Sequence, residues 1–189
     1  MTSTFDFLMV LYSIIIGVSI SQILTGIGHV IQGNKPVRLY WVHSGWVIFI
    51  FFLHIFVWFS AWHYATIEVW SMAGFMMFLA IPVVLFVASV ITLPDVDPER
   101  NYDMRDYYYK NYRWLHAMLV AIIVLTSANE YLLLDQYPFT PRNLARGTAA
   151  FLLCAGLLFG NAKLHGFLIT MIFLLIGFFT ASYRESIGG

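Results

Sequence analysis

Residues 41–64 read WVHSGWVIFIFFLHIFVWFSAWHY, and this stretch decides the class of fold. It contains no Asp, Glu, Lys or Arg from end to end. About 20 mostly apolar residues are enough for an α-helix to cross the hydrocarbon core of a bilayer. A helix is the expected form because lipid offers the backbone no hydrogen-bond partners. The stretch therefore predicts a transmembrane helix.

Similar apolar stretches lie on both sides of residues 41–64. They cover about residues 7–31, 70–93, 113–134, 144–160 and 163–182. The stretch at 144–160 is short, but Thr140-Pro141 is typical of a helix cap followed by proline at the first helical position, which extends this span to 141–160. We expect an all-α, polytopic integral membrane protein. One membrane domain would cover residues 1–189, folded as a compact bundle of six transmembrane helices.

The composition supports the bilayer as the main solvent and argues against several classes of protein. Apolar residues make up 60% of the chain and charged residues 11%, whereas soluble domains carry about 25% charged residues. The formal net charge is zero, so no global field attracts nucleic acid. The single cysteine cannot form an internal disulfide. No nucleotide-binding or nucleophile motif identifies an enzyme, and we expect the lipid bilayer, not nucleic acid, as partner.

The loops divide into two sides of the membrane, which we call side A and side B. Side A holds both termini and the loops near 64–69 and 135–143, and side B holds the other three loops. Side B carries Lys35, Arg38, Arg100, Arg105, Lys110, Arg113 and Lys163, and side A carries Arg142, Arg146 and Arg184. Because Lys and Arg residues concentrate on the cytoplasmic side, we expect a multi-pass protein of the cell membrane with both termini on the non-cytoplasmic side.

The loop at 94–113 carries signals for the start of the fourth helix. Asp97 followed by Pro98 is typical of a helix cap and a first helical residue. We therefore expect this helix to begin near residue 98 and to project from the membrane. At the level of the lipid headgroups, where aromatic residues are enriched, we then expect Tyr107, Tyr108, Tyr109 and Tyr112.

Polar residues inside the spans are candidates for function because they are costly in lipid. A helix turns about 100° per residue, so the span at 113–134 presents one stripe that includes His116, Ser127 and Glu130. In the span at 7–31, Ser21 and Gln22 lie on a face rich in small and polar residues. We expect these two faces to line a path for solute and these residues to line or gate it.

Glu130 has a second interpretation. Arg142 and Arg146 lie on the same side of the membrane, just beyond the next loop, so either could pair with its carboxylate. The sequence leaves open whether Glu130 lines a path or forms a structural ion pair between the fourth and fifth helices. Asn129 points away from the polar stripe, and we expect it to hydrogen-bond a neighbouring helix.

The histidines raise two further hypotheses. His54 lies near the middle of its span, where its ring nitrogens need a partner. It is either a core residue bonded to serine or backbone, or a titrating group on the path. His43, His116 and His165 lie at similar depth toward side B, and two of them on different helices could ligate haem b. No motif for a non-haem metal is present.

Gly156 and Gly160 form a GxxxG pattern in the span at 141–160. This pattern lets helices approach closely, either inside the bundle or between copies of the chain. We expect self-association into a homo-oligomer, because a bundle of this size needs partners to enclose a path.

These observations lead to three hypotheses about function. The first is a channel or small-solute or ion transporter, with the polar faces of the first and fourth helices along the path. The second is a membrane sensor, assembly factor or accessory subunit with no chemistry of its own. The third is a redox protein that binds haem b. No motif identifies a substrate.

Overall fold

The structure is a computed structural model that describes residues 4–33, 36–94, 101–136 and 140–182, with side chains up to residue 177. Six α-helices lie in these residues, and the expected all-α bundle is confirmed. Their bounds are α1 Thr4–Gln32, α2 Trp41–Ser60, α3 Met72–Thr92, α4 Met104–Leu134, α5 Pro141–Leu158 and α6 Ala162–Ser182. The other described elements are the strands β1 Val37–Arg38 and β2 Tyr102–Asp103 and the 3₁₀ helix η1 Ala61–Thr66.

Four segments are long and apolar enough to cross a bilayer. They are α1, α2 together with η1, α3 and α4. The apolar helix found in the described part of α6 is shorter, at Ala162–Gly177. α5 has 18 residues and carries Arg142 and Arg146 near its start. The structure therefore supports a membrane-spanning protein, whereas full spans for α5 and α6 stay a prediction.

Polar side chains cap the starts of α3 and α5. The Ser71 hydroxyl accepts a hydrogen bond from the backbone N–H of Gly74 at 3.0 Å, at the start of α3. The Thr140 hydroxyl accepts one from the N–H of Asn143 at 3.2 Å, and Pro141 follows it as the first residue of α5. The start of the fifth helix predicted from Thr140-Pro141 is therefore confirmed.

The start of the fourth helix differs from the prediction. α4 begins at Met104, and the side chain of Asp103 caps it by accepting from the N–H groups of Arg105 and Asp106. The expected start near residue 98 is wrong, because residues 102–103 are extended and pair in parallel with residues 37–38 as strand β2. Asp97 and Pro98 themselves lie outside the described residues.

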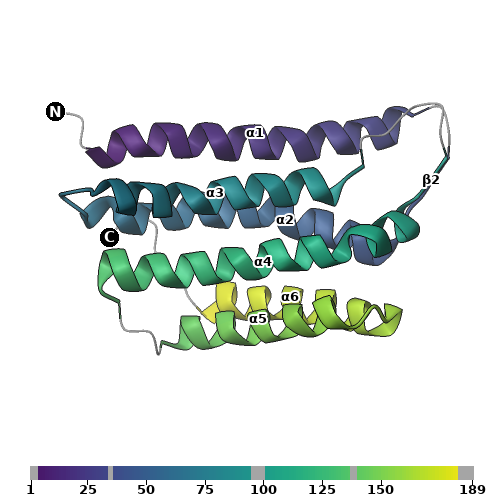
Figure 1. The fold of residues 1–189 in the computed structure, drawn as a ribbon. Coiled ribbons are helices and arrows are strands. Elements are labelled where there is room, and N and C mark those ends of the chain that lie inside the picture. The colour runs from purple at the N-terminus through teal and green to yellow at the C-terminus, as the bar shows by residue number, and fades with distance from the viewer. Residues whose placement is uncertain (1–3, 34–35, 95–100, 137–139, 183–189) are drawn as a thin grey trace.

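The helices form layers around α4 (Figure 1). α1 packs on α2 and α3, and α3 packs between α1 and α4. On the opposite side of α4 lie α5 and α6, and α6 also contacts α2. Because helices that follow one another in the chain alternate in direction, the end of α4 and the start of α5 meet at the same side of the bundle as the start of α1 (Figure 1). This is side A.

One buried polar side chain links α4 to α3. The side-chain amide of Asn129, which is fully buried, donates to the carbonyl oxygen of Met77 on α3 at 3.0 Å. The hydrogen bond between helices expected for Asn129 is confirmed. The carbonyl that Pro82 leaves without a helical N–H donor is that of Phe78, the residue after Met77.

Candidate functional site

One buried carboxylate and two arginines meet where α4 ends and α5 begins. Arg146 donates to both carboxylate oxygens of Glu130, at 2.5 Å to Oε2 and 3.0 Å to Oε1. Arg142 donates to Oε2 at 3.2 Å and to the side chain of Gln136 at 2.6 Å. The side chain of Glu130 is only 8% exposed, whereas those of Arg142 and Arg146 are 30% and 22% exposed. The ion pairs considered in the sequence are therefore present in the structure.

Local sequence explains how these three side chains come together. α4 ends at Leu134, and Asp135 turns the chain with a positive φ of 49°. The Thr140-Pro141 cap then starts α5 next to the last turn of α4. Arg142 and Arg146 are four residues apart, so they lie on one face of α5, one turn from each other. That face is the one that meets Glu130.

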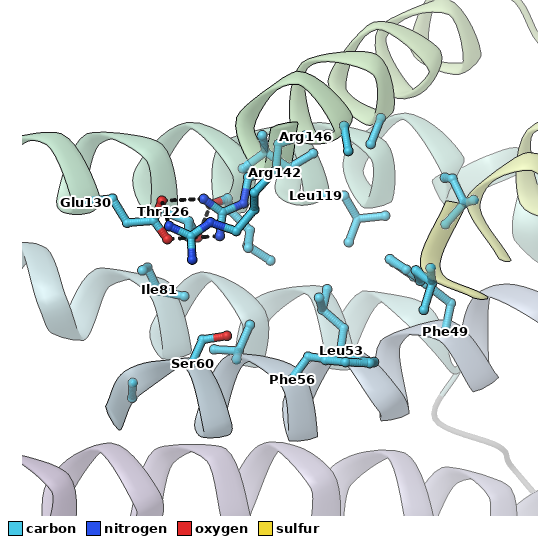
Figure 2. Close-up of a pocket in the computed structure, with 18 of the residues that line it drawn as sticks. Phe49, Leu53, Phe56, Ser60, Ile81, Leu119, Thr126, Glu130, Arg142 and Arg146 are labelled. Carbon is cyan, nitrogen blue, oxygen red and sulfur yellow. Dashed lines mark hydrogen bonds and ion pairs between the residues drawn. The ribbon is translucent and has the colours of Figure 1, made fainter. Parts of the chain in front are cut away.

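The charged cluster forms one end of a cavity of about 330 Å³ that lies between α2, α4, α5 and α6 (Figure 2). Most of its wall is apolar, and Figure 2 shows Leu119 and Phe49 toward the end away from Glu130. Thr126 and Ser60 add hydroxyl groups to the wall. Ligand sites in proteins have about this size or more, with apolar walls and a few placed polar groups.

Tyr64 adds an unusual polar group to the same cavity. Its side chain lines the cavity and is buried, and its ring packs against Phe78 at 5.3 Å between ring centres. Its hydroxyl has no hydrogen-bond partner in the described residues. The charges of Glu130 and both arginines lie within electrostatic range of it. A buried hydroxyl without a partner costs free energy, so a ligand atom that accepts a hydrogen bond would remove this cost.

Toward side B, the cavity ends at a layer of aromatic side chains. Phe49, at the inner end of the cavity, packs edge-on against Trp46 with ring centres 5.6 Å apart. Trp46 donates to the Tyr108 hydroxyl at 3.0 Å, and this hydroxyl lies 2.7 Å from Nδ1 of His165. The other ring nitrogen of His165 lies 3.0 Å from the carbonyl oxygen of Phe159. We call Trp46, Tyr108, Tyr112, His116 and His165 the aromatic layer.

His116 and Gly156 complete this layer. The Nδ1 atom of His116 lies 2.7 Å from the carbonyl oxygen of Tyr112, and its ring packs against Trp46 and His165. A Cβ atom added at Gly156 would lie 2.8 Å from Nε2 of His116. Gly156 therefore serves close packing inside the chain. Self-association through the GxxxG pattern stays a prediction, and it is not needed to explain Gly156.

The three histidines proposed as haem ligands do not present their nitrogens to a common space. Nε2 of His43 bonds the carbonyl oxygen of Thr92 at 2.7 Å. Both nitrogens of His165 have protein partners, and Nε2 of His116 is buried against Gly156. The rings of His116 and His165 pack edge-on with their centres 5.2 Å apart. This arrangement does not fit ligation of haem b between two of them.

His54 binds two serines from other helices. Its Nε2 atom hydrogen-bonds to the hydroxyl of Ser19 on α1 and to that of Ser89 on α3, the latter at 3.1 Å. Its Nδ1 atom lies 2.6 Å from the carbonyl oxygen of Ile50. The hydroxyl oxygens of the two serines lie 2.9 Å from each other. All three residues are buried, and none of them lines the cavity. This is the arrangement expected of a core histidine bonded to serine and backbone.

The remaining candidates from the sequence lie apart from the cavity. Ser21 and Gln22 are exposed on the outer layer of the bundle, on α1. Ser127 is half-buried on α4 and does not line the cavity, whereas its neighbour Thr126 does. Since α3 packs between α1 and α4, the polar faces of the first and fourth helices do not enclose one path within a single chain. Among the predicted path residues, the cavity takes in Glu130.

The sequence analysis did not predict Tyr64, Ser60 and Thr126 in the cavity wall or Ser19 in the core. His54 offered a signal for Ser19, because a histidine at mid-membrane needs a partner at the same depth and Ser19 lies mid-span. No sequence signal predicted Tyr64 in the cavity wall, because its position there depends on which helices pack together.

A scan against protein-family models, a search of curated proteins and a search of solved structures found no match for this chain. The proposed function is therefore argued from the cavity and the side chains that line it.

Proposed function

We propose that this chain is a small-solute transporter of the cell membrane and that the cavity between α2, α4, α5 and α6 is its binding site. The observation that carries the proposal is that an apolar cavity of about 330 Å³ ends at a cluster of one buried carboxylate and two half-buried arginine side chains. Charged groups inside a membrane bundle typically mark a substrate or ion pathway. This cluster meets a space large enough for a small ligand.

The two ends of the cavity differ, which favours a transporter over an open channel. At side A, Arg142 and Arg146 keep part of their side chains exposed, so solute can reach the charged end. At the inner end, the hydrogen-bonded and closely packed aromatic layer separates the cavity from side B. A site open to one side and closed to the other is one state of alternating access.

The ion pairs suggest how the two states would be coupled. Glu130 belongs to α4, and both of its partners belong to α5. A solute that competes with Glu130 for the guanidinium groups would loosen the contact between these helices. The polar end of the cavity would thereby act as a gate as well as a binding site.

The loop charges supply an orientation for this proposal. The excess of Lys and Arg on side B supports a cytoplasmic location for that side. The charged end of the cavity, at side A, then faces the non-cytoplasmic side.

Thiol labelling in membrane vesicles tests transport without knowledge of the substrate. Cys154, the only cysteine of the chain, is replaced by alanine. Thr126→Cys is then introduced in the cavity wall, with Ala149→Cys as a second position on α5. A charged, membrane-impermeant methanethiosulfonate reagent is applied to right-side-out and to inside-out vesicles. A transporter exposes the cavity to each side in turn, so we expect reaction in both preparations.

A lipid-facing cysteine on the same helix is the control. Val124 is 59% exposed on the outside of α4, so Val124→Cys should resist the charged reagent in both preparations. Reaction of Thr126→Cys and Ala149→Cys from one side only would contradict transport. It would indicate a sensor or accessory subunit with a fixed binding pocket.

A further inference from the structure

We infer that the ligand of this cavity is an anionic amphiphile, with one carboxylate or phosphate group at Arg142, Arg146 and Tyr64 and an apolar chain directed toward Phe49. This inference rests on the proposed function in taking the cavity as the binding site. It adds the chemical class of the ligand, which no sequence motif identifies.

The charge at the polar end of the cavity favours an anionic ligand. Two arginines and one glutamate line the cavity, which leaves a formal excess of one positive charge. The arginines lie in the first turns of α5, where the helix dipole is also positive and where no acidic residue of α5 balances it. Each guanidinium has more N–H donors than its bonds to Glu130, Gln136 and Asn143 use. Guanidinium forks match carboxylate and phosphate oxygens closely.

The orphaned hydroxyl of Tyr64 points to the same class of ligand. Tyr64 lines the cavity, its hydroxyl is buried without a partner in the described residues, and the charges of Glu130, Arg146 and Arg142 all act on it. The phenolic O–H can donate to an anionic oxygen, and a bond of this kind is about twice as strong as one between neutral groups. An anion held by the arginines would therefore satisfy a group that the empty protein leaves unpaired.

The rest of the cavity calls for an apolar chain. Beyond Thr126, its wall consists of aliphatic and aromatic side chains such as Leu119, Leu153 and Phe49. A small hydrophilic anion would leave this wall in contact with water or empty space. A chain of methylene groups would bury it, at about 0.8 kcal/mol for each buried CH₂. Two sources offer this chemistry: a free single-chain amphiphile and an acidic phospholipid of the bilayer.

Binding of tritiated dodecanoate to protein in phosphatidylcholine nanodiscs tests the inference. We expect saturable binding above that of empty nanodiscs. Dodecyl phosphate should displace the probe, whereas dodecanol and dodecyltrimethylammonium, which lack the negative charge, and acetate, which lacks the chain, should not. Equal displacement by dodecanol would overturn the inference, because the arginines would then contribute nothing to recognition.

Variants of the polar end sharpen this test. Arg142→Gln and Arg146→Gln should each weaken dodecanoate binding about tenfold or more, as expected for loss of a charge-assisted hydrogen bond. Glu130→Gln should tighten binding, because the carboxylate competes with the ligand for the same donors. Arg105→Gln, an exposed arginine at the opposite end of α4, should have no effect on binding.

Tyr64→Phe keeps the inference testable if the arginine variants fail to fold. This change removes a hydroxyl that has no partner, so the melting temperature of the empty protein should stay equal or rise. Dodecanoate binding should nevertheless weaken about tenfold. Tyr131→Phe, at an exposed tyrosine of α4 that follows Glu130 in the sequence, is the matched control and should change neither. Undiminished binding by Tyr64→Phe would contradict the inference.

Nanodiscs that contain phosphatidylglycerol distinguish the two sources of ligand. If phosphatidylglycerol abolishes dodecanoate binding, and native mass spectrometry finds it on the wild type but not on Arg146→Gln, the ligand is an acidic phospholipid. If dodecanoate binding persists, the ligand is a free amphiphile. Absence of both kinds of binding overturns the inference. Reaction of Thr126→Cys from both sides would still support transport of a different class of solute, so the two failures remain distinguishable.

Discussion

His54 shows how one buried polar residue connects three helices. It lies on α2, and its Nε2 atom bonds Ser19 on α1 and Ser89 on α3. Hydrogen bonds between membrane helices contribute on average about 0.6 kcal/mol and up to about 1.7 kcal/mol. We expect Ser19→Ala and Ser89→Ala each to lower the free energy of unfolding by an amount in this range. Unfolding in mixtures of mild detergent and dodecyl sulfate, followed by circular dichroism, measures the change.

The double variant is the more demanding test. Either serine alone still leaves Nε2 of His54 with one partner, whereas loss of both leaves a buried nitrogen unsatisfied, at a further cost of about 1–3 kcal/mol. The double variant should therefore lose more stability than the sum of the single variants. Ser127→Ala, at a half-buried serine outside this cluster, should change stability by less than about 0.5 kcal/mol. Strict additivity would show that His54 gains little from its serine partners.

At the scale of a helix, α5 contains one glycine that is closely packed and one that is not. A Cβ atom at Gly156 would lie 2.6 Å from Cδ1 of Leu168 and 2.8 Å from Nε2 of His116, whereas one at Gly147 would meet nothing within 4 Å. The His116 ring cannot move away easily, because its Nδ1 atom is bonded to the Tyr112 carbonyl and its faces and edges are packed. Close approach of α5 to α4 and α6 therefore depends on Gly156.

Gly156→Ala and Gly147→Ala form a matched pair within this helix. Overpacking costs about 1–3 kcal/mol, so Gly156→Ala should lower the free energy of unfolding by this amount. Gly147→Ala should raise it by up to about 1 kcal/mol, because alanine is the better helix former. The same unfolding assay measures both. Equal effects of the two changes would contradict the packing role of Gly156.

For the whole molecule, the sequence predicts where the helices lie in the chain better than it predicts which helices pack against each other. Apolar runs and the Thr140-Pro141 cap identify six helices with ends mostly within a few residues. The outward-facing side chains are as apolar as the core, since Phe7 and Leu144 are 72% and 75% exposed. Hydrophobicity therefore cannot tell the lipid face from the packed face. The polar faces of the first and fourth helices do not meet within one chain, because α3 packs between α1 and α4.

The part of the site that could be predicted depended on charge. Glu130, Arg142 and Arg146 were paired from the sequence because buried charges need partners and the connecting loop is short. Tyr64 belongs to η1, which is distant in sequence from Arg142 and Arg146. It shares a cavity with them only because α2, η1 and α5 line the same space. Local sequence patterns do not predict which residues distant in sequence come together in the fold.

The last prediction concerns the orientation of the whole bundle in its membrane. The α5–α6 turn and strand β1 lie at side B, and the segment that joins η1 to α3 lies at side A. In the Cys154→Ala background, Asn161→Cys should react with a charged thiol reagent only in inside-out vesicles, and Glu68→Cys only in right-side-out vesicles. Both positions are exposed, so neither change disturbs the core. The physical reason is the concentration of Lys and Arg on side B, which retains that side in the cytoplasm. The reverse pattern would place the open end of the cavity in the cytoplasm. Arg142 and Arg146 would then be accessible to anions from the cytoplasm.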